Sequence, residues 1–184
     1  MEYAFKMFNK DLTCTKGRGI FQYEEGRWFE EPQANCVKNG FHCAKNPLDC
    51  LDYYGWDSSV CYLVEIGGDI DEDAYNSKIS CTRMKLRARL SLEDFVAEAC
   101  RYICRHPHMP DNTRVKAERA TAGKEHFCIA RGKEPKARGN LGDLIALLQE
   151  KQDSREIRQA GVFEVDGINL LPGTWYNVQG VADA

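Results

Sequence analysis

The segment 40–54 combines a predicted strand with a predicted helix and carries three side chains with a polar ring, His42, Tyr53 and Tyr54. The strand covers 40–44, and the helix is expected to run from Pro47 to Tyr54. Asn46 is a preferred N-cap residue, and proline suits the first helical position because no N–H is needed there. A strand that leads directly into a capped helix often places side chains at the rim of a pocket. Ordinary core packing is the competing interpretation.

Thiol and imidazole groups also lie close together near the middle of the chain, where they offer the ligand types that zinc prefers. Cys100 and Cys104 share one face of a predicted helix, and His106 and His108 follow in a loop. Tetrahedral zinc sites usually draw on two separated ligand pairs, which this single short arc does not provide. We therefore predict no metal here and explain the pattern by packed thiols and surface histidines; zinc binding by these four residues stays open as the alternative.

The chain has nine cysteines, an odd number, and no C-x-x-C motif. Free cysteine behaves as a small buried apolar residue, and disulfides are rare in a reducing compartment. We expect the thiols to be reduced and mostly buried. Cys128, two residues after His126, could suggest a nucleophile and its base, but no third partner is visible in the sequence.

Composition excludes several classes of function. The net charge is −3 and the isoelectric point is about 5.9, so no overall basic field favours nucleic acid. No apolar run approaches the ~20 residues that cross a bilayer, and the N-terminus lacks a signal-peptide core. We expect a protein of the cytosol without a membrane partner. Lys and Arg outnumber Glu between Arg114 and Arg138; this basic run could bind phosphates or an acidic partner, or be a solvated face.

Periodicity predicts an α+β fold with a mixed, mainly antiparallel β-core, two main helices at about 47–54 and 92–105, and a β-rich C-terminal part. Ser91 and Asp94 resemble a capping box at the start of the second helix, whose apolar face carries Leu92, Phe95, Val96, Ala99 and Ile103. We expect one domain in 1–112 and a second part in 113–184. The strands are predicted at 3–8, 20–23, 60–66, 79–90 and 127–130.

The C-terminal part contains one segment in which strand and helix propensities compete and another that favours a hairpin. For 144–148 we favour a strand, although helix propensity at 143–151 leaves that alternative open. A β-hairpin with a turn at Asp166-Gly167 is predicted from 161–168 and 175–178.

Several motifs resemble an uncharacterised protein family encoded by phages and prophages. They include Phe8-Asn9-Lys10-Asp11, Gly40-Phe41-His42-Cys43, the segment 123–148 and Leu171-Pro172-Gly173-Thr174-Trp175-Tyr176. The resemblance covers most of the chain and implies a phage-related origin. Longer members carry Gly/Ala-rich repeats typical of a β-solenoid, so it also implies short solenoid-like rungs in the C-terminal part.

The N-terminal part is similar to the core of ADP-ribosyltransferases of the poly(ADP-ribose) polymerase type. Gly40 to Ala44 align with that family's Gly-Ile-Tyr-Phe-Ala, and Tyr53 aligns with its second tyrosine. In that family the two aromatic side chains sandwich the nicotinamide of NAD, which implies ligand-binding roles for His42, Tyr53 and the adjacent Tyr54. The family's His-Gly-Ser/Thr motif is missing from 3–8. The catalytic glutamate is unplaced, with only positional candidates at Glu118, Glu125 and Glu164.

The predicted function is therefore a phage-encoded accessory or host-takeover protein that binds NAD or a related nucleotide in a pocket whose enzymatic activity is uncertain. No cofactor is required in this reading. Two alternatives remain open. The chain could be a non-enzymatic inhibitor that binds a host or anti-phage defence protein through its basic surface, or a structural, tail-associated phage protein.

Overall fold

The computed structural model describes residues 2–17, 19–36, 38–73 and 76–183 of the chain. They form two compact units, Met1–Phe95 and Val96–Ala184, whose division falls within a helix. The sequence placed a domain boundary later, after residue 112, and that boundary stays a prediction. Strands dominate both units and most strand pairs are antiparallel, which confirms a strand-rich α+β class. None of the helices in the described part of the chain is long and apolar enough to span a membrane.

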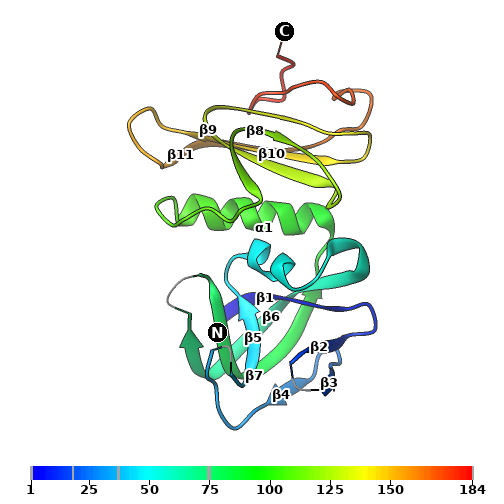
Figure 1. Cartoon of the computed structure of the whole chain (residues 1–184), viewed down its shortest axis with the longest axis vertical. Coiled ribbons are helices and arrows are strands. Elements are labelled where there is room, and N and C mark those ends of the chain that lie inside the picture. Colours follow the sequence, from blue (N-terminus) through cyan, green and yellow to red (C-terminus); the bar gives the residue numbers. More distant parts are fainter. Residues whose placement is uncertain (1, 18, 37, 74–75, 184) are drawn as a thin grey trace. The chain divides into compact units, whose positions relative to one another are not determined.

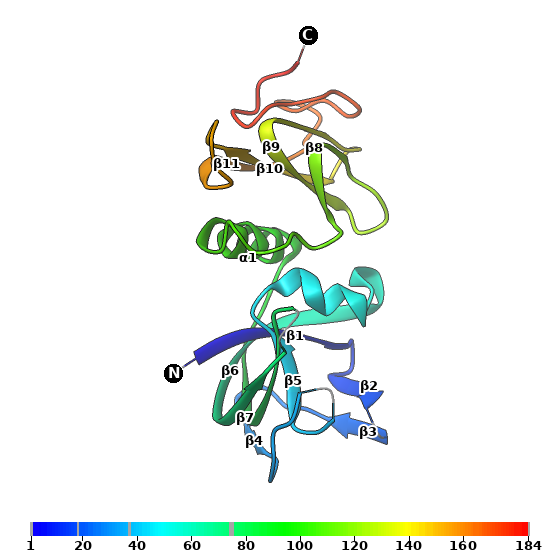
Figure 2. The same ribbon diagram turned by 60° about the vertical axis from the view of Figure 1, so that its left-hand side comes forward.

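The first unit is built on four antiparallel strands that close on themselves as a small barrel (Figures 1 and 2). β1 pairs with β5 and β6, and β7 completes the circuit by pairing with β5 and β6. A further strand, β4, pairs with β7, and β2 and β3 form a separate hairpin. The bounds are β1 Glu2–Asn9, β2 Thr13–Gly17, β3 Gly19–Gln22, β4 Trp28–Glu30, β5 Phe41–Ala44, β6 Ser59–Glu72 and β7 Lys78–Arg89.

Alternate residues of these strands fill the barrel. Ala4 and Phe8 of β1 pack in one buried cluster with Val64 of β6 and Phe41 of β5. Cys61, on β6, is also fully buried although it lies outside that cluster. The predicted strand 60–66 therefore exists and is buried along nearly all of its length, as its apolar sequence indicated.

The helix expected from Pro47 to Tyr54 is shorter than predicted. It is a 3-10 helix, η1 (Pro47–Asp52), and the Asn46 side chain caps it by accepting from the Leu48 N–H at 3.1 Å. The Cys50 thiol donates to the Phe5 carbonyl oxygen at 3.3 Å, which ties η1 to β1. Tyr53 and Tyr54 follow the helix instead of belonging to it, and a second short helix, η2 (Trp56–Ser58), comes next.

The backbone at position 40, just before β5, requires a glycine. Its φ of +83° lies in the left-handed region. A Cβ atom at this position would overlap the Ser80 hydroxyl and lie 3.0 Å from the Cys81 carbonyl oxygen. The close approach of β5 to β7 therefore depends on the missing side chain.

The long helix, α1 (Leu92–Arg105), has the predicted bounds. Ser91 Oγ accepts from the Asp94 N–H at 3.0 Å, and the Asp94 carboxylate accepts from the Ser91 N–H at 3.3 Å. This reciprocal cap confirms the predicted capping box. Of the predicted apolar face, Leu92 is only half-buried, and the buried members are Phe95, Val96, Ala99 and Ile103.

The second unit contains a four-stranded sheet in the order β11-β10-β9-β8. β8, β9 and β10 run parallel, and β11 is antiparallel to β10. Residues 144–148 form a strand, so the helical alternative is wrong; all five are buried, as both-face burial in a parallel sheet requires. The bounds are β8 Val115–Thr121, β9 Phe127–Arg138, β10 Leu144–Glu150 and β11 Ile157–Glu164.

The predicted C-terminal hairpin does not form. β11 ends at Glu164 and pairs with β10, while Tyr176 makes only isolated bridges to Ala137 and Ala182. At the predicted Asp-Gly turn, the carboxylate of Asp166 accepts from the N–H groups of the three residues 168–170, at 2.8 to 3.0 Å. An Asp side chain that satisfies three backbone donors favours a compact loop over a two-residue turn.

Candidate functional site

A lysine lies inside the barrel of the first unit. Lys6 is only 7% exposed and shares a strand face with the core residues Ala4 and Phe8. Its ammonium donates to the His42 carbonyl oxygen at 2.6 Å and lies 5.5 Å and 5.7 Å from the ring centroids of Phe8 and Tyr23. A buried ammonium is costly unless it is bonded, so these groups hold the charge in place.

The lysine occupies the point at which two strands part. The ladder between β1 and β5 contains one pair, Phe5 with Ala44. Beyond that pair the Lys6 side chain, instead of a backbone hydrogen bond, connects β1 to β5. A buried positive charge thus lies between these two strands.

Cys14 of β2 lies in the field of this charge. The Tyr54 hydroxyl donates to the Cys14 sulfur at 3.2 Å. Burial opposes ionisation of the Cys14 thiol, but the Lys6 ammonium and the Tyr54 hydrogen bond outweigh it, so the pKa of Cys14 lies below its ordinary value. Burial and the neighbouring Cys14 raise the pKa of Tyr54 to about 12, so this phenol remains a donor at neutral pH.

The predicted ligand-binding residues His42 and Tyr53 lie in two different environments, one half-buried and one exposed. His42 alternates with the core residues Phe41 and Cys43, is half-buried, and has its pKa lowered by burial and by Lys6, which leaves its imidazole neutral at pH 7. His42 therefore lies within the influence of Lys6, and Tyr54 bonds to Cys14, which Lys6 also influences. Tyr53 is 46% exposed, and the Lys78 ammonium lies 5.0 Å from the centroid of its ring.

Lys6 and Cys14 are the site residues that the sequence analysis missed. One signal was available: Lys6 is the only charged residue between Tyr3 and Phe8, at a position that alternation assigns to the buried face. Nothing in the sequence marks Cys14, because its partners Lys6 and Tyr54 come from other segments.

We expect Cys14 to be the most reactive of the nine thiols at neutral pH, because it combines partial exposure with a lowered pKa. With limiting iodoacetamide and peptide mass spectrometry, Cys14 should be alkylated first, and its rate should reach a plateau at lower pH than that of Cys104. Cys104 is the internal control, since it is exposed but burial of its thiol raises its pKa.

Tyr54→Phe removes the hydrogen bond to the thiolate and should slow Cys14 alkylation about fivefold at neutral pH, the equivalent of ~1 kcal/mol. After denaturation without reductant, close to nine thiols should react, since all nine cysteines are free. Faster modification of Cys104 or Cys36 than of Cys14 would contradict the prediction.

At the end of α1, one of the cysteines is buried in the fold and one of the histidines stacks on a neighbouring ring. Cys100 is buried, and burial raises its pKa to about 12. His106 stacks on the Tyr102 ring at a centroid distance of 4.3 Å. Within the described ranges, no group of three or more His, Cys, Asp or Glu side chains is arranged to hold a metal ion.

Cys128 and His126 each contact another group of the second unit. Burial raises the pKa of Cys128 to about 12, and its thiol donates to the Arg138 carbonyl oxygen at 3.7 Å. His126 Nδ1 lies 3.3 Å from the buried carboxylate of Asp143. These contacts favour a structural role for both residues.

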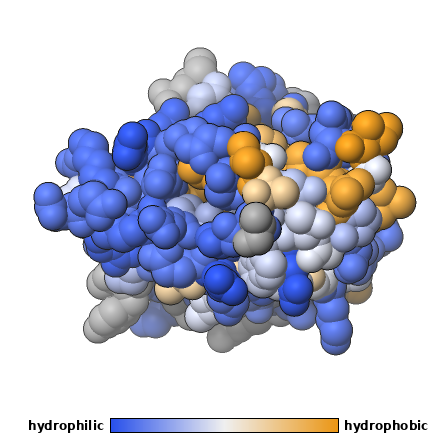
Figure 3. Space-filling view, turned by 90° about the horizontal axis from the view of Figure 1, so that it is seen from above, coloured by the Kyte–Doolittle hydropathy of each residue, from blue (hydrophilic) through white to orange (hydrophobic). Residues whose placement is uncertain are grey.

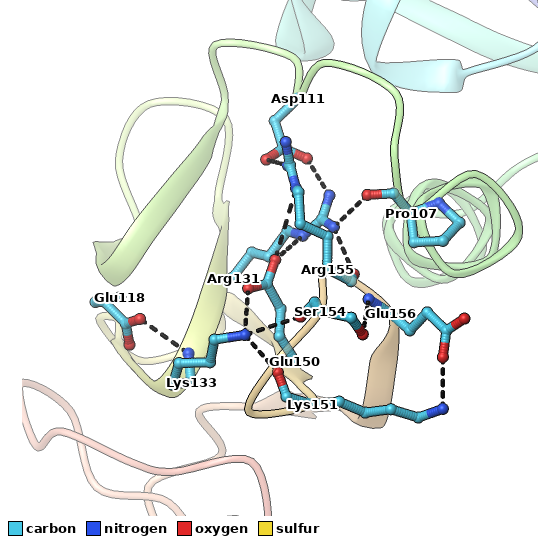
Figure 4. Close-up of polar contacts among 10 residues, drawn as sticks. All are labelled: Pro107, Asp111, Glu118, Arg131, Lys133, Glu150, Lys151, Ser154, Arg155 and Glu156. Atoms are coloured by element: carbon cyan, nitrogen blue, oxygen red, sulfur yellow. Dashed lines mark hydrogen bonds and ion pairs between the residues drawn. The ribbon is translucent and has the colours of Figure 1, made fainter.

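The basic run of the second unit is largely neutralised within the fold. Arg131 is almost fully buried and donates to Asp111 at 2.6 Å and to Glu150 at 2.9 Å (Figure 4). Its other terminal nitrogen donates to the carbonyl oxygens of Pro107 and Arg155. Lys133 also lies 3.4 Å from Glu150. Arg119 and Arg138 instead lie over the Trp175 ring, 5.4 Å and 4.6 Å from its centroid.

A family model described as "Domain of unknown function (DUF7666)" matches residues 3–98, just over half of the chain. The matched residues include every strand of the first unit, apart from the first residue of β1, and the first half of α1. No curated protein and no solved structure matches the chain significantly.

Proposed function

The chain belongs to the DUF7666 family, and we propose that its first unit binds NAD or a related nucleotide beside His42, Tyr53 and Tyr54. The observation that carries the proposal is that each tyrosine has a cation on its ring. Lys78 lies 5.0 Å from the Tyr53 centroid and Lys16 lies 5.8 Å from the Tyr54 centroid.

A nucleotide offers a flat base and a negative phosphate, and this surface offers the complements of both. An exposed phenol ring can stack on a base, which is worth ~1–3 kcal/mol per ring. The adjacent ammonium groups can pair with phosphate oxygens. Tyr53 is the better stacking platform because it is about half-exposed, whereas the Tyr54 hydroxyl is already bonded to Cys14.

His42 and Lys6 supply the inner end of the proposed site. A neutral imidazole can stack on a nicotinamide or adenine ring or accept a hydrogen bond from it. The Lys6 ammonium adds positive charge between β1 and β5, where it is shielded from water. Both features favour a ligand with an anionic group near a flat ring.

We propose binding without transfer, as expected of a degenerate ADP-ribosyltransferase-like site. The three glutamates considered from the sequence belong to the second unit. Glu118 accepts from the N–H groups of Lys133 and Glu134, and Glu125 pairs with Arg114. Glu164 lies at the end of β11. A nucleotide-binding protein without these groups in its site would act by sequestering or sensing its ligand.

The proposal also covers the origin of the chain and the architecture of the second unit. As a phage-encoded accessory protein, the chain would act on a nucleotide of the host cytosol. The second unit would be a short solenoid-like piece: Val115, Ile129 and Ala146 stand in register across β8, β9 and β10, and residues 122–126 and 139–143 join these strands. Stacked parallel strands joined by short turns are typical of solenoids.

The test of the proposal is nucleotide binding by the intact chain. NAD, ADP-ribose and cyclic nucleotides should be screened by thermal shift, since a ligand at 100 times its Kd adds ~2.7 kcal/mol of apparent stability. Tyr53→Ala and His42→Ala should each weaken binding about tenfold or more, because each removes one stacking ring.

Trp28→Ala is the matched control, because the Trp28 ring also has cations over it, Arg83 at 4.7 Å and Lys85 at 5.9 Å. It should leave nucleotide affinity unchanged. The proposal fails if no nucleotide raises the melting temperature, or if Trp28→Ala weakens binding as much as Tyr53→Ala does.

A second candidate function is protein binding through the second unit. Figure 3 shows hydrophobic residues gathered on one side of the face it displays. The Leu141 side chain lies against Gly167, next to Ile168, which is 84% exposed. The exposed apolar residues of the second unit include Leu141, Ile168, Leu171 and Val181. Exposed apolar side chains of this kind favour a protein partner, such as a host or defence protein.

Ile168→Asp should abolish such protein binding and leave nucleotide binding intact.

A further inference from the structure

The sheet of the second unit ends in a strand whose outer edge has no backbone partner within the described ranges. β11 is the last strand of the order β11-β10-β9-β8 and pairs only with β10 there. The opposite edge strand, β8, is interrupted at Glu118, whose φ is +59°, and its register with β9 shifts beside that residue. Bends of this kind protect an edge from pairing, and the stretch 159–164 of β11 has none.

The ladder indicates which groups of β11 point outward. The Val165 N–H donates to the Asp143 carbonyl oxygen at 2.9 Å, toward the neighbouring strand. Backbone groups alternate in direction along an antiparallel strand, so those of Glu164, Val162 and Ala160 face away from β10. In the part of the chain that the structure describes, they form a row of donors and acceptors that an added strand could meet.

The side chains of β11 suit a copy of the same strand. In the sequence, Arg158 and Glu164 lie three residues before and after Gly161, and Ala160 and Val162 lie one residue before and after it; Arg158 is at the bulge where β11 shifts register against β10. In an antiparallel pair centred on Gly161, each arginine stands opposite a glutamate and each alanine opposite a valine. A two-fold interface requires this kind of self-complementarity.

The surface beside the strand adds apolar area to the contact. An open hollow of about 290 Å³ lies between α1 and β11, and its exposed lining is almost entirely apolar. Ala97, Cys100 and Cys104 line it from the helix, and Ala160 and Val162 line it from the strand. A partner strand at the edge of β11 would place its own alanine and valine next to this hollow.

We propose that two copies of this chain associate through their β11 strands, antiparallel and centred on Gly161, to join two four-stranded sheets into one. The charges of Arg158 and Glu164 fix the register. This association is independent of the nucleotide site, which belongs to the first unit.

The experiment is sedimentation equilibrium of the full chain over a wide concentration range, with charge-swapped variants. The wild type should form a dimer. Arg158→Glu and Glu164→Arg each place like charges opposite one another twice per dimer and should raise the dimer Kd about tenfold. The double variant restores both attractive pairs and should return the Kd to within about threefold of the wild type.

A backbone variant tests the same contact in another way. Val162→Pro removes an outward N–H without touching the ladder with β10, so the chain should fold and remain monomeric. Circular dichroism checks folding of each variant. A wild type that stays monomeric at all concentrations would overturn the proposal, and would leave a different protein as the occupant of this edge. Failure of the double variant to recover would overturn the register.

Discussion

Arg131→Ala should lower the free energy of unfolding of the second unit by about 3–5 kcal/mol, because it removes a buried guanidinium that pairs with the partly exposed carboxylates of Glu150 and Asp111. The Arg131 side chain is 3% exposed, and Glu150 and Asp111 are 13% and 27% exposed. Its four hydrogen bonds connect β9 to β10, to the loop after α1 and to the turn before β11. Loss of one side chain therefore disconnects four segments.

Urea unfolding followed by circular dichroism measures the loss, and hydrogen exchange of peptides from 127–150 assigns it to the second unit. Arg131→Lys keeps the charge but not the planar fork and should give an intermediate loss. Arg155→Ala is the matched control: Arg155 also bonds Asp111, but it is 45% exposed and should contribute only ~0–1 kcal/mol. Equal losses for Arg131→Ala and Arg155→Ala would show that burial of the ion pair is unimportant.

Phe95→Ala is the second substitution with a large expected effect, about 3–5 kcal/mol of unfolding free energy. Phe95 is fully buried, and its ring lies 4.9 Å from the Trp56 ring, centroid to centroid. Truncation removes this contact and leaves a cavity that the surrounding side chains fill only in part. A loss of this size should lower the melting temperature by more than about 10 °C in a unit of this length.

Tryptophan fluorescence is a suitable measurement, because Trp56 contacts the substituted ring directly. Leu92→Ala, at the half-buried start of the same helix, is the control and should cost far less. If Leu92→Ala destabilised the protein as much as Phe95→Ala, the buried face of α1 would be different from the one described. An unchanged melting temperature for Phe95→Ala would have the same meaning.

Capping residues and apolar periodicity in the sequence correctly predicted the helical features that depend only on residues close together in the chain. The bounds of α1 followed from the Ser91–Asp94 cap and a helical apolar period, and both interactions act within a few residues. The Asn46 cap of η1 was predicted for the same reason, but the length of η1 was not. The Tyr53 N–H bonds to the Cys50 carbonyl oxygen, three residues back, and this tight turn closes a helix that propensity alone would extend.

The candidate site shows the limit of local reasoning. His42, Tyr53 and Tyr54 were selected from one continuous segment, and in the structure Tyr54 contacts Cys14 whereas Tyr53 contacts Lys78. The groups that give the site its charge come from other segments: Lys6 from β1 and Cys14 from β2. Their pairing depends on how the strands close, which the sequence of any one segment does not specify.

The sequence by itself therefore determined most of the strands and the bounds of α1, because alternation, capping and helical period are properties of adjacent residues. Tertiary structure decided which strands pair. Segment 161–164 had a plausible local partner in 175–178, yet it pairs with β10, where Ile145 and Leu147 bury a continuous apolar surface. Burial of that surface outweighs a local turn because the hydrophobic contribution grows with the apolar area removed from water, whichever part of the chain supplies it.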